Sequence, residues 1–269
     1  MKIVITGSTK GLGKALAEEF LQSGDDLVIS SRDNSRVENT VKELQSKYPE
    51  RKIYGKTCDV GNYDEINSLS QFSLEKLGNV DIWINNAGTS GYLHSDLSDM
   101  DPNVIRNIVD TNMLGTLFGI QAALKIMIPK KSGNIFNIEG AGSNGMASPR
   151  MVPYGATKAG FPQILKSLKM ELKGSGVGVH DLSPGIMITD FITIPIEEKH
   201  KKIMNILADT PEQVAQWAVP KMRSIHGMGK RLKYLTLTKA FFRFMTAGKR
   251  KNRFYDEDGK FIRDKHTSV

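Results

Sequence analysis

The sequence has a single cysteine, Cys58, among its 269 residues. One cysteine excludes an internal disulfide and is consistent with a reducing compartment, so we expect a cytoplasmic protein. Cys58 itself is interpreted as a small packing residue beside Asp59. The 5 histidines do not cluster at the spacing of metal ligands. We therefore predict that the chain binds no metal ion.

Long apolar stretches are also missing. No run approaches the roughly 18 apolar residues typical of a membrane-spanning helix, so no span is predicted. The chain has no internal repeat and no low-complexity tract. Its hydrophobic content of 39% is enough for a core, and its length suits one α/β domain with extensions.

A glycine-rich turn follows the first apolar stretch. Residues 2–5 are typical of a short strand, and apolar residues at helical spacing predict a helix over 14–23. The turn between them has the spacing Gly-x-x-x-Gly-x-Gly rather than Gly-x-Gly-x-x-Gly. A strand, a glycine turn and a helix in this order indicate a dinucleotide site with the pyrophosphate at the helix N-terminus. The predicted cofactor contacts of the turn are Gly7, Ser8, Thr9, Lys10, Gly11, Leu12 and Gly13.

The end of the second strand indicates which dinucleotide is bound. Residues 27–31 form an apolar stretch that stops at Arg32-Asp33. A carboxylate at this point binds the ribose 2′-hydroxyl of NAD, whereas an arginine accommodates the 2′-phosphate of NADP. Arg32 comes first, and Lys10 lies in the glycine turn where it can reach the same phosphate, so we predict NADPH. The alternative is that Arg32 is solvated and Asp33 selects NAD.

Two further strand ends carry residues suited to the cofactor. Cys58-Asp59-Val60 ends one strand, where Asp59 can bond an adenine amino group and Val60 lies beside it. The apolar strand 80–84 runs into Asn85-Asn86-Ala87-Gly88, whose small residues permit close approach of the cofactor. Asn86, Ala87 and Gly88 are therefore predicted contacts.

The order of the elements predicts the fold. Additional strands are expected over 134–138 and 177–182, and helical patterns separate the strands throughout. This alternation predicts an α/β protein with a Rossmann-type doubly wound parallel sheet and helices on both faces. We expect a dinucleotide-binding and catalytic domain over 1–220 and a C-terminal extension over 221–269.

Tyr154 and Lys158 lie four residues apart and share one helix face. An ammonium near a phenol favours the phenolate and lowers the phenol's pKa from about 10. A tyrosine of this kind can protonate an oxygen during carbonyl reduction, or deprotonate a hydroxyl in the reverse direction. The alternative is an ordinary surface tyrosine and lysine.

Taken together, these motifs make the chain similar to the short-chain dehydrogenase/reductase family. The matching elements cover residues 1 to about 190, and in order they are the turn 6–13, Asn85-Asn86-Ala87-Gly88, Asn112, Tyr154-x-x-x-Lys158 and Pro184-Gly185-x-x-x-Thr189. The resemblance implies that Tyr154 is the acid/base and that Lys158 binds the nicotinamide ribose and lowers the Tyr154 pKa. It implies that Asn112 holds a water in a proton relay. Thr189, after Pro184 and Gly185, would touch the carboxamide side of the nicotinamide.

Two positions depart from the family pattern. Ala141 stands where the family has its catalytic serine, and Ser143 follows two residues later. Either the glycine-rich loop bends so that Ser143 supplies the hydroxyl, or no serine does; we predict Ser143. Pro162 falls inside the helix expected to carry Tyr154 and Lys158, where it removes one backbone hydrogen bond.

Within the family, the chain resembles the chlorophyll b reductases. The similar stretches are 135–143, 177–180, Met222-Arg223, Tyr234-Leu235-Thr236 and Arg253-Phe254-Tyr255-Asp256. Those enzymes reduce a formyl group on a chlorin ring to hydroxymethyl with NADPH. Because the first strand begins at Lys2, we expect no plastid transit peptide, which leaves open a prokaryotic relative with another substrate.

The C-terminal extension carries the positive charge of the chain. Residues from Lys221 onward hold 14 basic and 4 acidic residues, giving +10, and the remaining 23 basic and 25 acidic residues give −2. Phe241, Phe242 and Phe244 lie close to this basic cluster, a combination that suits peripheral contact with an anionic membrane. The alternative is that the aromatic residues pack on the domain or at a subunit interface. No nucleic-acid motif accompanies the charge, so no nucleic-acid partner is predicted.

Residues 186–210 are predicted to form a substrate lid, because they are apolar and Met-rich after the Pro184-Gly185 turn. The alternative is that they cover the end of the sheet. We expect a homo-oligomeric, NADPH-dependent oxidoreductase acting on a bulky apolar aldehyde or ketone. The first hypothesis is chlorophyll b to 7-hydroxymethyl chlorophyll, and the alternatives are a general alcohol dehydrogenase for lipid-like substrates and a non-catalytic NADP-binding sensor. The predicted catalytic residues are Tyr154, Lys158, Ser143 and Asn112.

Overall fold

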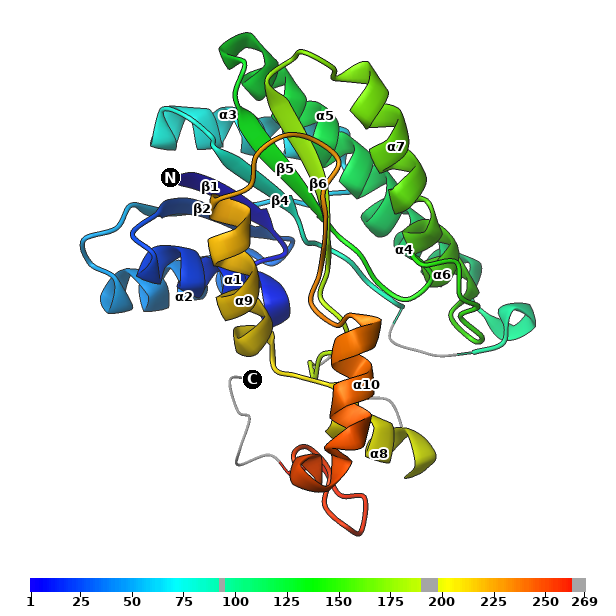
Figure 1. Cartoon of the computed structure of the whole chain (residues 1–269). Helices are drawn as coiled ribbons and strands as arrows, with labels where there is room; N and C mark the ends of the chain where they lie inside the picture. Colours follow the sequence, from blue (N-terminus) through cyan, green and yellow to red (C-terminus); the bar gives the residue numbers. More distant parts are fainter. Residues whose placement is uncertain (92–94, 190–197, 263–269) are drawn as a thin grey trace.

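The protein is built around one parallel sheet (Figure 1), seen in a computed structural model that describes residues 1–91, 95–189 and 198–262. The sheet has seven strands in the order β3-β2-β1-β4-β5-β6-β7, and every neighbouring pair is parallel. The strands are β1 (Lys2–Thr6), β2 (Asp26–Ser31), β3 (Ile53–Thr57), β4 (Ile82–Asn85), β5 (Gly133–Ile138), β6 (Val177–Ser183) and β7 (Arg231–Lys233). This order confirms the predicted doubly wound sheet, and the direction in which strands are added to the sheet reverses between β1 and β4.

Helices cover both faces of the sheet because the central strands are apolar on both sides (Figure 1). Leu16, Phe20 and Val219 pack on one face, which α1 (Gly11–Gln22), α2 (Asn34–Lys47) and α9 (Pro211–Arg223) cover. Leu69, Ala123 and Leu165 pack on the other face. Helices α3 (Tyr63–Leu77), α5 (Gly115–Met127) and α7 (Phe161–Glu171) supply these residues. Helices α4 (Pro102–Val109) and α6 (Val152–Ala159) pack against each other and against residues 110–114, and a short turn, η1 (Leu97–Asp99), precedes α4.

One helical stretch bears on the prediction that the chain has no membrane-spanning helix. Residues 102–130 join α4, a π-helical turn η2 (Asp110–Leu114), α5 and η3 (Ile128–Lys130). By length and composition alone, this stretch is long and apolar enough to cross a bilayer. Ile120, Ala123 and Met127 are buried among residues of the sheet, however. The stretch therefore has the packing of a core helix, which passes the same test.

The sheet continues past the boundary expected at residue 220, because β7 is its seventh strand. Beyond the sheet lie α8 (Glu198–Leu207), α10 (Leu237–Met245) and η5 (Ala247–Arg250), which project together from one end of the sheet (Figure 1). Phe254 and Tyr255 are buried against Ala208 and Met204. We call these elements and residues 251–262 the C-terminal lobe. Part of the predicted lid, residues 190–197, lies outside the described residues.

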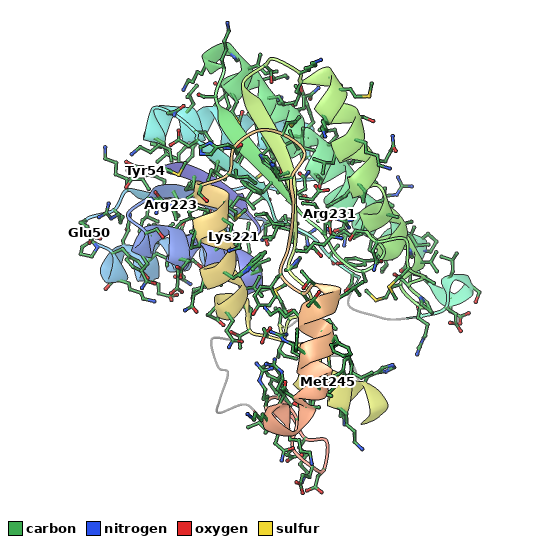
Figure 2. The ribbon with its side chains drawn as sticks, viewed as in Figure 1. Glu50, Tyr54, Lys221, Arg223, Arg231 and Met245 are labelled. Atoms are coloured by element: carbon green, nitrogen blue, oxygen red, sulfur yellow. The ribbon has the colours of Figure 1, made fainter. Side chains whose placement is uncertain are left out.

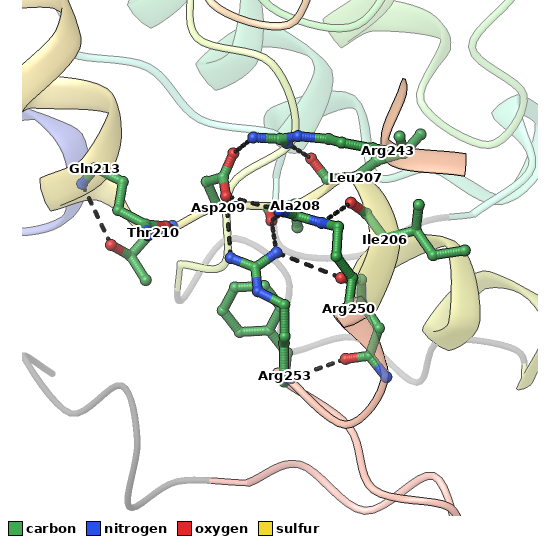
Figure 3. A network of polar contacts seen from close by, with 11 residues as sticks. Ile206, Leu207, Ala208, Asp209, Thr210, Gln213, Arg243, Arg250 and Arg253 are labelled. Carbon is green, nitrogen blue, oxygen red and sulfur yellow. Dashed lines mark hydrogen bonds and ion pairs between the residues drawn. The ribbon is translucent and has the colours of Figure 1, made fainter. Parts of the chain in front are cut away.

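Three arginines of the C-terminal lobe converge on Asp209 (Figure 3). Arg243 forms an ion pair with one carboxylate oxygen, and Arg250 and Arg253 bind the other at 3.2 and 3.0 Å. The same guanidinium groups donate to the carbonyls of Ile206, Leu207 and Ala208 at the end of α8. Arg250 and Arg253, two of the 14 basic residues from Lys221 onward, therefore hold the lobe together.

We expect Asp209→Asn to destabilise the lobe strongly. The substitution leaves three guanidinium groups without their shared carboxylate, and breaking a buried pair costs about 3–5 kcal/mol of the free energy of unfolding. Burial alone would raise the Asp209 pKa, but the arginines hold it below its ordinary value of 3.8. The stabilisation is thus complete above pH 3.8 and is lost as the pH falls through the lower folded-state pKa.

Urea unfolding and limited proteolysis of residues 198–262 measure this effect. Asp258→Asn, which removes an exposed carboxylate of the same lobe, serves as the control. Equal stability of the two variants would contradict the prediction.

Candidate active site

A cleft of about 2600 Å³ opens at the carboxyl ends of the strands. This is where ligands bind in doubly wound sheets, because the reversal in strand order separates the loops there. Most of the residues predicted from the sequence line the cleft, and they are Gly7, Thr9, Lys10, Gly11, Leu12, Gly13, Arg32, Val60, Asn86, Ala87, Gly88, Tyr154, Lys158, Pro184, Gly185 and Thr189. Four predicted residues do not line it: Ser8, Asp59, Asn112 and Ser143.

The glycine turn packs closely on its neighbours at Gly7 and Gly13 and is more open at Gly11, where a Cβ would lie 3.8 Å from the Thr189 methyl. Gly7 has a φ of +62°, and a Cβ there would lie 2.8 Å from the Cα of Ala87. A Cβ on Gly13 would lie 2.4 Å from the Gly7 carbonyl oxygen. The N-terminus of α1 has no side-chain cap and no acidic residue in its first turn. Its backbone N–H groups and helix dipole therefore favour an anion in the cleft.

Ser8 supports the turn from behind. The side chain is fully buried, its Oγ donates to the carbonyl of Ile5 at 2.7 Å, and it accepts from the backbone N–H of Ser30 at 3.0 Å. These bonds join the turn to β2. The Ser8 hydroxyl thus fixes the position of the loop, and the cofactor contact predicted for Ser8 stays a prediction.

Arg32 and Asp33 follow β2 at one end of the cleft. Arg32 lines the cleft, and its guanidinium donates to Asn107 Oδ1, a neutral acceptor, at 3.2 Å. Asp33 accepts from the backbone N–H of Arg36 at 3.0 Å as the N-cap of α2 and pairs with the Arg36 guanidinium at 3.2 Å. The carboxylate of Asp33 is thus occupied by α2, which weakens the alternative that it selects NAD.

Asp59 opens onto a smaller depression beside the cleft. Its Oδ1 accepts from the backbone N–H of Gly61 at 3.0 Å. Thr111 lines both the depression and the cleft, so the two adjoin. The adenine contact predicted for Asp59 stays a prediction.

Asn86 and Asn112 are held by the backbone on either side of the cleft. Asn86 Nδ2 donates to the carbonyls of Thr6 and Gly7, which joins the end of β4 to the glycine turn. Asn112 lies in the π-helical turn, fully buried. Its side chain accepts from the Thr89 N–H at 2.8 Å and donates to the Thr89 carbonyl and to Thr157 Oγ1. Asn112 therefore connects the loop after β4 to α6, and its side chain does not face the cleft.

Tyr154 and Lys158 project from α6, which ends before Gly160. A Cβ at Gly160 would lie 2.7 Å from the Cε of Met113, so the helix passes close to η2 here. Pro162 stands at the start of α7, where its missing N–H costs nothing. The proline thus does not kink a continuous helix, because α6 and α7 are separate helices.

The lysine is buried beside the tyrosine ring. Lys158 Nζ donates to the carbonyl of Ile138 at 2.8 Å and lies 5.8 Å from the centroid of the Tyr154 ring. It lies 4.4 Å from the centroid of the Phe161 ring. A Cβ at Gly140 would lie 2.1 Å from the Tyr154 hydroxyl oxygen, so only glycine permits this approach.

The pKa values correct the expectation that Lys158 lowers the pKa of Tyr154. Burial raises the pKa of Tyr154 to about 12. Burial also lowers the pKa of Lys158 to about 8, against the attraction of the Glu139 and Asp181 carboxyls. Loss of water is therefore the largest cause of the pKa shift of each side chain in this structure.

Ser143 is turned away from the cleft. Its hydroxyl donates to the carbonyl of Gly140 at 2.7 Å and to Glu139 Oε2 at 3.3 Å. Ser148, in the same loop, lines the cleft, and a Cβ on Gly155 would lie 2.9 Å from its Oγ. Sequence reasoning chose Ser143 because it is nearer to the family position and did not consider Ser148.

The loop over Tyr154 is fixed by an ion pair. Arg231 of β7 forms a bidentate pair with Glu139, and its Nη2 also donates to the carbonyl of Ser143 at 3.0 Å. The Glu139 side chain is fully buried. This ion pair, which sequence reasoning missed, determines which way the loop points.

A buried row of polar side chains crosses the sheet beneath this loop. Asn85, Asn137 and Asp181 lie in register on β4, β5 and β6, and each amide donates to the next residue, at 3.0 and 3.2 Å. Burial raises the pKa of Asp181 to about 7. Within the described part of the chain, Asp181 Oδ2 has no hydrogen-bond partner. A proton on that oxygen at neutral pH relieves the cost of burying a charge.

Metal binding is not indicated by the described residues, in which no three His, Cys, Asp or Glu side chains gather. The prediction that the chain binds no metal is not tested by this arrangement.

Two solved structures share the fold. A variant of actinorhodin polyketide ketoreductase with NADPH has a TM-score of 0.74 and 25% identity, covering 87% of this chain and 95% of that chain. An alcohol dehydrogenase from the archaeon Thermococcus sibiricus, complexed with 5-hydroxy-NADP, has a TM-score of 0.75 and 20% identity. The match covers 88% of this chain and 96% of that chain.

Curated relatives match almost the whole chain. A chloroplastic chlorophyll(ide) b reductase of Arabidopsis thaliana is 40% identical over 268 residues, which are 95% of this chain and 77% of the relative. A chloroplastic protein of Oryza sativa subsp. japonica, named as a probable chlorophyll(ide) b reductase, is 39% identical over 276 residues. That match covers 97% of this chain but only 55% of the relative, so the chain spans about half of the relative's length.

The family assignment follows from these matches and from the site. The sequence profile of short chain dehydrogenases matches residues 1–199, which include the glycine turn, Tyr154 and Lys158. The chain therefore belongs to the short-chain dehydrogenase/reductase family of oxidoreductases.

Proposed function

We propose that the protein reduces a carbonyl group on a bulky apolar substrate with NADPH. The observation that carries the proposal is the position of Tyr154 and Lys158, which line the same cleft as the uncapped N-terminus of α1. A proton donor and a dinucleotide site that share one cleft support a hydride transfer with protonation of the product oxygen.

The chain's own residues fit the cofactor. Gly7 and Gly13 allow the tight turn and its packing, Gly11 leaves open space for a backbone-bound pyrophosphate, and α1 supplies N–H donors. Lys10 and Arg32 line the same cleft and supply positive charge for a 2′-phosphate. NADPH, when bound, supplies the hydride.

The remaining steps belong to the protein. Tyr154 donates its phenolic proton to the carbonyl oxygen, and Lys158 binds the ribose beside it. Ser148 donates a hydrogen bond to the same oxygen in place of the predicted Ser143. Asn112 is a positioning residue, because its hydrogen bonds hold α6, which carries Tyr154 and Lys158, against the loop after β4. The expected homo-oligomer stays a prediction.

The substrate side of the cleft supports an apolar compound. The walls there carry large apolar residues from the loop after β6, the Ser148 loop and the C-terminal lobe: Met146, Ile186, Met187, Ile188, Leu237, Tyr255 and Phe261. The names of the Arabidopsis and Oryza relatives make the formyl group of chlorophyll(ide) b the first candidate. The inward-facing Ser143 hydroxyl favours one rival, an NADP-binding sensor without turnover.

Tyr154→Phe should separate these two functions. The variant keeps the ring but has no transferable proton, so turnover should fall by a factor on the order of 10² or more while NADPH binding changes only a few-fold. Turnover is followed at 340 nm with formyl chlorins and small aldehydes, and Tyr48→Phe, another cleft tyrosine, is the control. Near-normal turnover of Tyr154→Phe would show that Tyr154 is not the acid, and no turnover by wild type on any carbonyl would favour the sensor.

A second pair of variants tests which serine acts on the oxygen. Ser148→Ala removes a donor that faces the cleft, so turnover should fall roughly 10- to 1000-fold, as for other oxyanion donors. Ser143→Ala should leave turnover within a few-fold and lower the free energy of unfolding by about 1–3 kcal/mol, because it removes a buried hydrogen bond. Steady-state kinetics and urea unfolding are measured for both variants. Slow turnover of Ser143→Ala with near-normal turnover of Ser148→Ala would show that Ser143 is the donor.

Cofactor choice is tested at Arg32. Arg32→Ala should raise the Kd of NADPH about 10- to 100-fold, the loss expected for a charge-assisted hydrogen bond, and change the Kd of NADH less than threefold. Arg36→Ala is the matched control because Arg36 also lines the cleft but pairs with Asp33. Binding is measured by titration calorimetry. A wild-type preference for NADH, or equal weakening of both cofactors by Arg32→Ala, would rule out the assignment.

A further inference from the structure

Helix α10 carries its large apolar side chains on the outside. Leu237, Phe241 and Met245 follow one another at i, i+4 and i+8, and Phe241 and Met245 are 61% and 71% exposed. Phe242 beside them is 62% exposed. A surface helix ordinarily turns such a stripe toward the core. The alternative in which these aromatic residues pack on the domain is therefore wrong for this chain.

The charged residues of α10 are on the inside. Arg243 is only 8% exposed and binds Asp209. Lys239, one turn earlier, holds its ammonium 3.3 Å from the centroid of the Tyr234 ring. The Asp209 contacts thus fix the helix with its polar stripe inward, and the apolar stripe must face outward. An outward apolar stripe on a rigidly held helix indicates a contact with an apolar partner.

The position of α10 relates this stripe to the cleft. Leu237 and Ala240, at the start of α10, line the cleft together with Tyr255 and Phe261. Met245 is at the far end of the helix, remote from the sheet (Figure 2). The apolar stripe therefore begins at the cleft and leads away from the sheet.

Charge distinguishes between an anionic membrane and a second copy of the chain. The elements of the C-terminal lobe carry 10 basic and 4 acidic residues, giving +6. Lys249 and Lys251 follow α10 and are exposed. A symmetric contact between two copies through this lobe would bring like charges together, which is unfavourable. An anionic leaflet instead attracts the lysines while its acyl region accepts the aromatic side chains.

We propose that α10 is a membrane-docking helix, which inserts the Leu237-Phe241-Phe242-Met245 surface into an anionic bilayer and sets the mouth of the cleft at the lipid boundary. The benefit of this arrangement rests on the proposed function, because an apolar substrate dissolved in lipid would reach the cleft without crossing water. The docking itself needs no turnover, so the two proposals can fail separately.

The test uses the full chain with two kinds of vesicle. Sedimentation is measured with phosphatidylcholine vesicles and with vesicles that contain phosphatidylglycerol as one third of the lipid. Wild type should sediment with the anionic vesicles at low salt and bind at least tenfold more weakly at 0.5 M NaCl, because salt screens the lysines. Binding that ignores lipid charge would overturn the proposal.

Three sets of variants separate the contributions. Phe241→Ser with Phe242→Ser should weaken vesicle binding at least tenfold, and Lys249→Gln with Lys251→Gln should remove most of the salt dependence. Met170→Ser, at an 81% exposed methionine on α7, is the matched control and should bind like wild type. All three should reduce a small soluble aldehyde at the wild-type rate, because none of these residues lines the cleft.

Two further outcomes would overturn the proposal. One is that the Phe241→Ser, Phe242→Ser variant binds vesicles as wild type does. The other is that wild type does not bind anionic vesicles while sedimentation velocity shows that the variant has lost the oligomeric state of wild type, since α10 would then contact a second copy. If wild type binds anionic vesicles but reduces no aldehyde, only the proposed function is refuted.

Discussion

The ion pair between Glu139 and Arg231 supports the whole site. It joins the end of β5 to β7 across 92 residues of sequence and holds the loop that lies over Tyr154. The same arginine binds the carbonyl of Ser143, which turns that hydroxyl toward Gly140 and leaves Ser148 on the cleft. The tyrosine depends on this loop in turn, because its hydroxyl oxygen rests against Gly140. Under the proposed function, a strand that lies beyond the family-profile match therefore influences which serine can act as the oxyanion donor.

In the C-terminal lobe, too, a buried carboxylate fixes the position of a neighbouring segment. At Glu139 a buried carboxylate fixes a loop, whereas at Asp209 it fixes a helix and so determines which face of that helix meets the surroundings. Asp209 does not line the cleft, and Glu139, which does, attracts the Lys158 ammonium. Both show that buried ion pairs here specify geometry, a role that is separate from their contribution to the free energy of unfolding.

Sequence alone predicted the features that depend on short segments. The glycine turn, the Asn85-Asn86-Ala87-Gly88 strand end and the i, i+4 pair of Tyr154 and Lys158 are local patterns, and they led to the fold and to most of the cleft. It failed where the outcome depends on distant partners. The direction of the Ser143 hydroxyl depends on Arg231, and the burial of Arg250 and Arg253 depends on Asp209. The pKa of Tyr154 depends on how much water the folded chain excludes, which spacing along a helix does not reveal.

The raised pKa of Tyr154 has a consequence for proton transfer. With its pKa at about 12, the buried phenol is almost entirely protonated at pH 7 in the cofactor-free protein. Carbonyl reduction needs that proton, but burial also makes the phenol a weaker acid than a free tyrosine, so proton release is less favourable. A change in the surroundings that lowers this pKa would ease proton release in reduction and would also populate the phenolate that alcohol oxidation requires. The surroundings of one phenol therefore affect both directions of the reaction together.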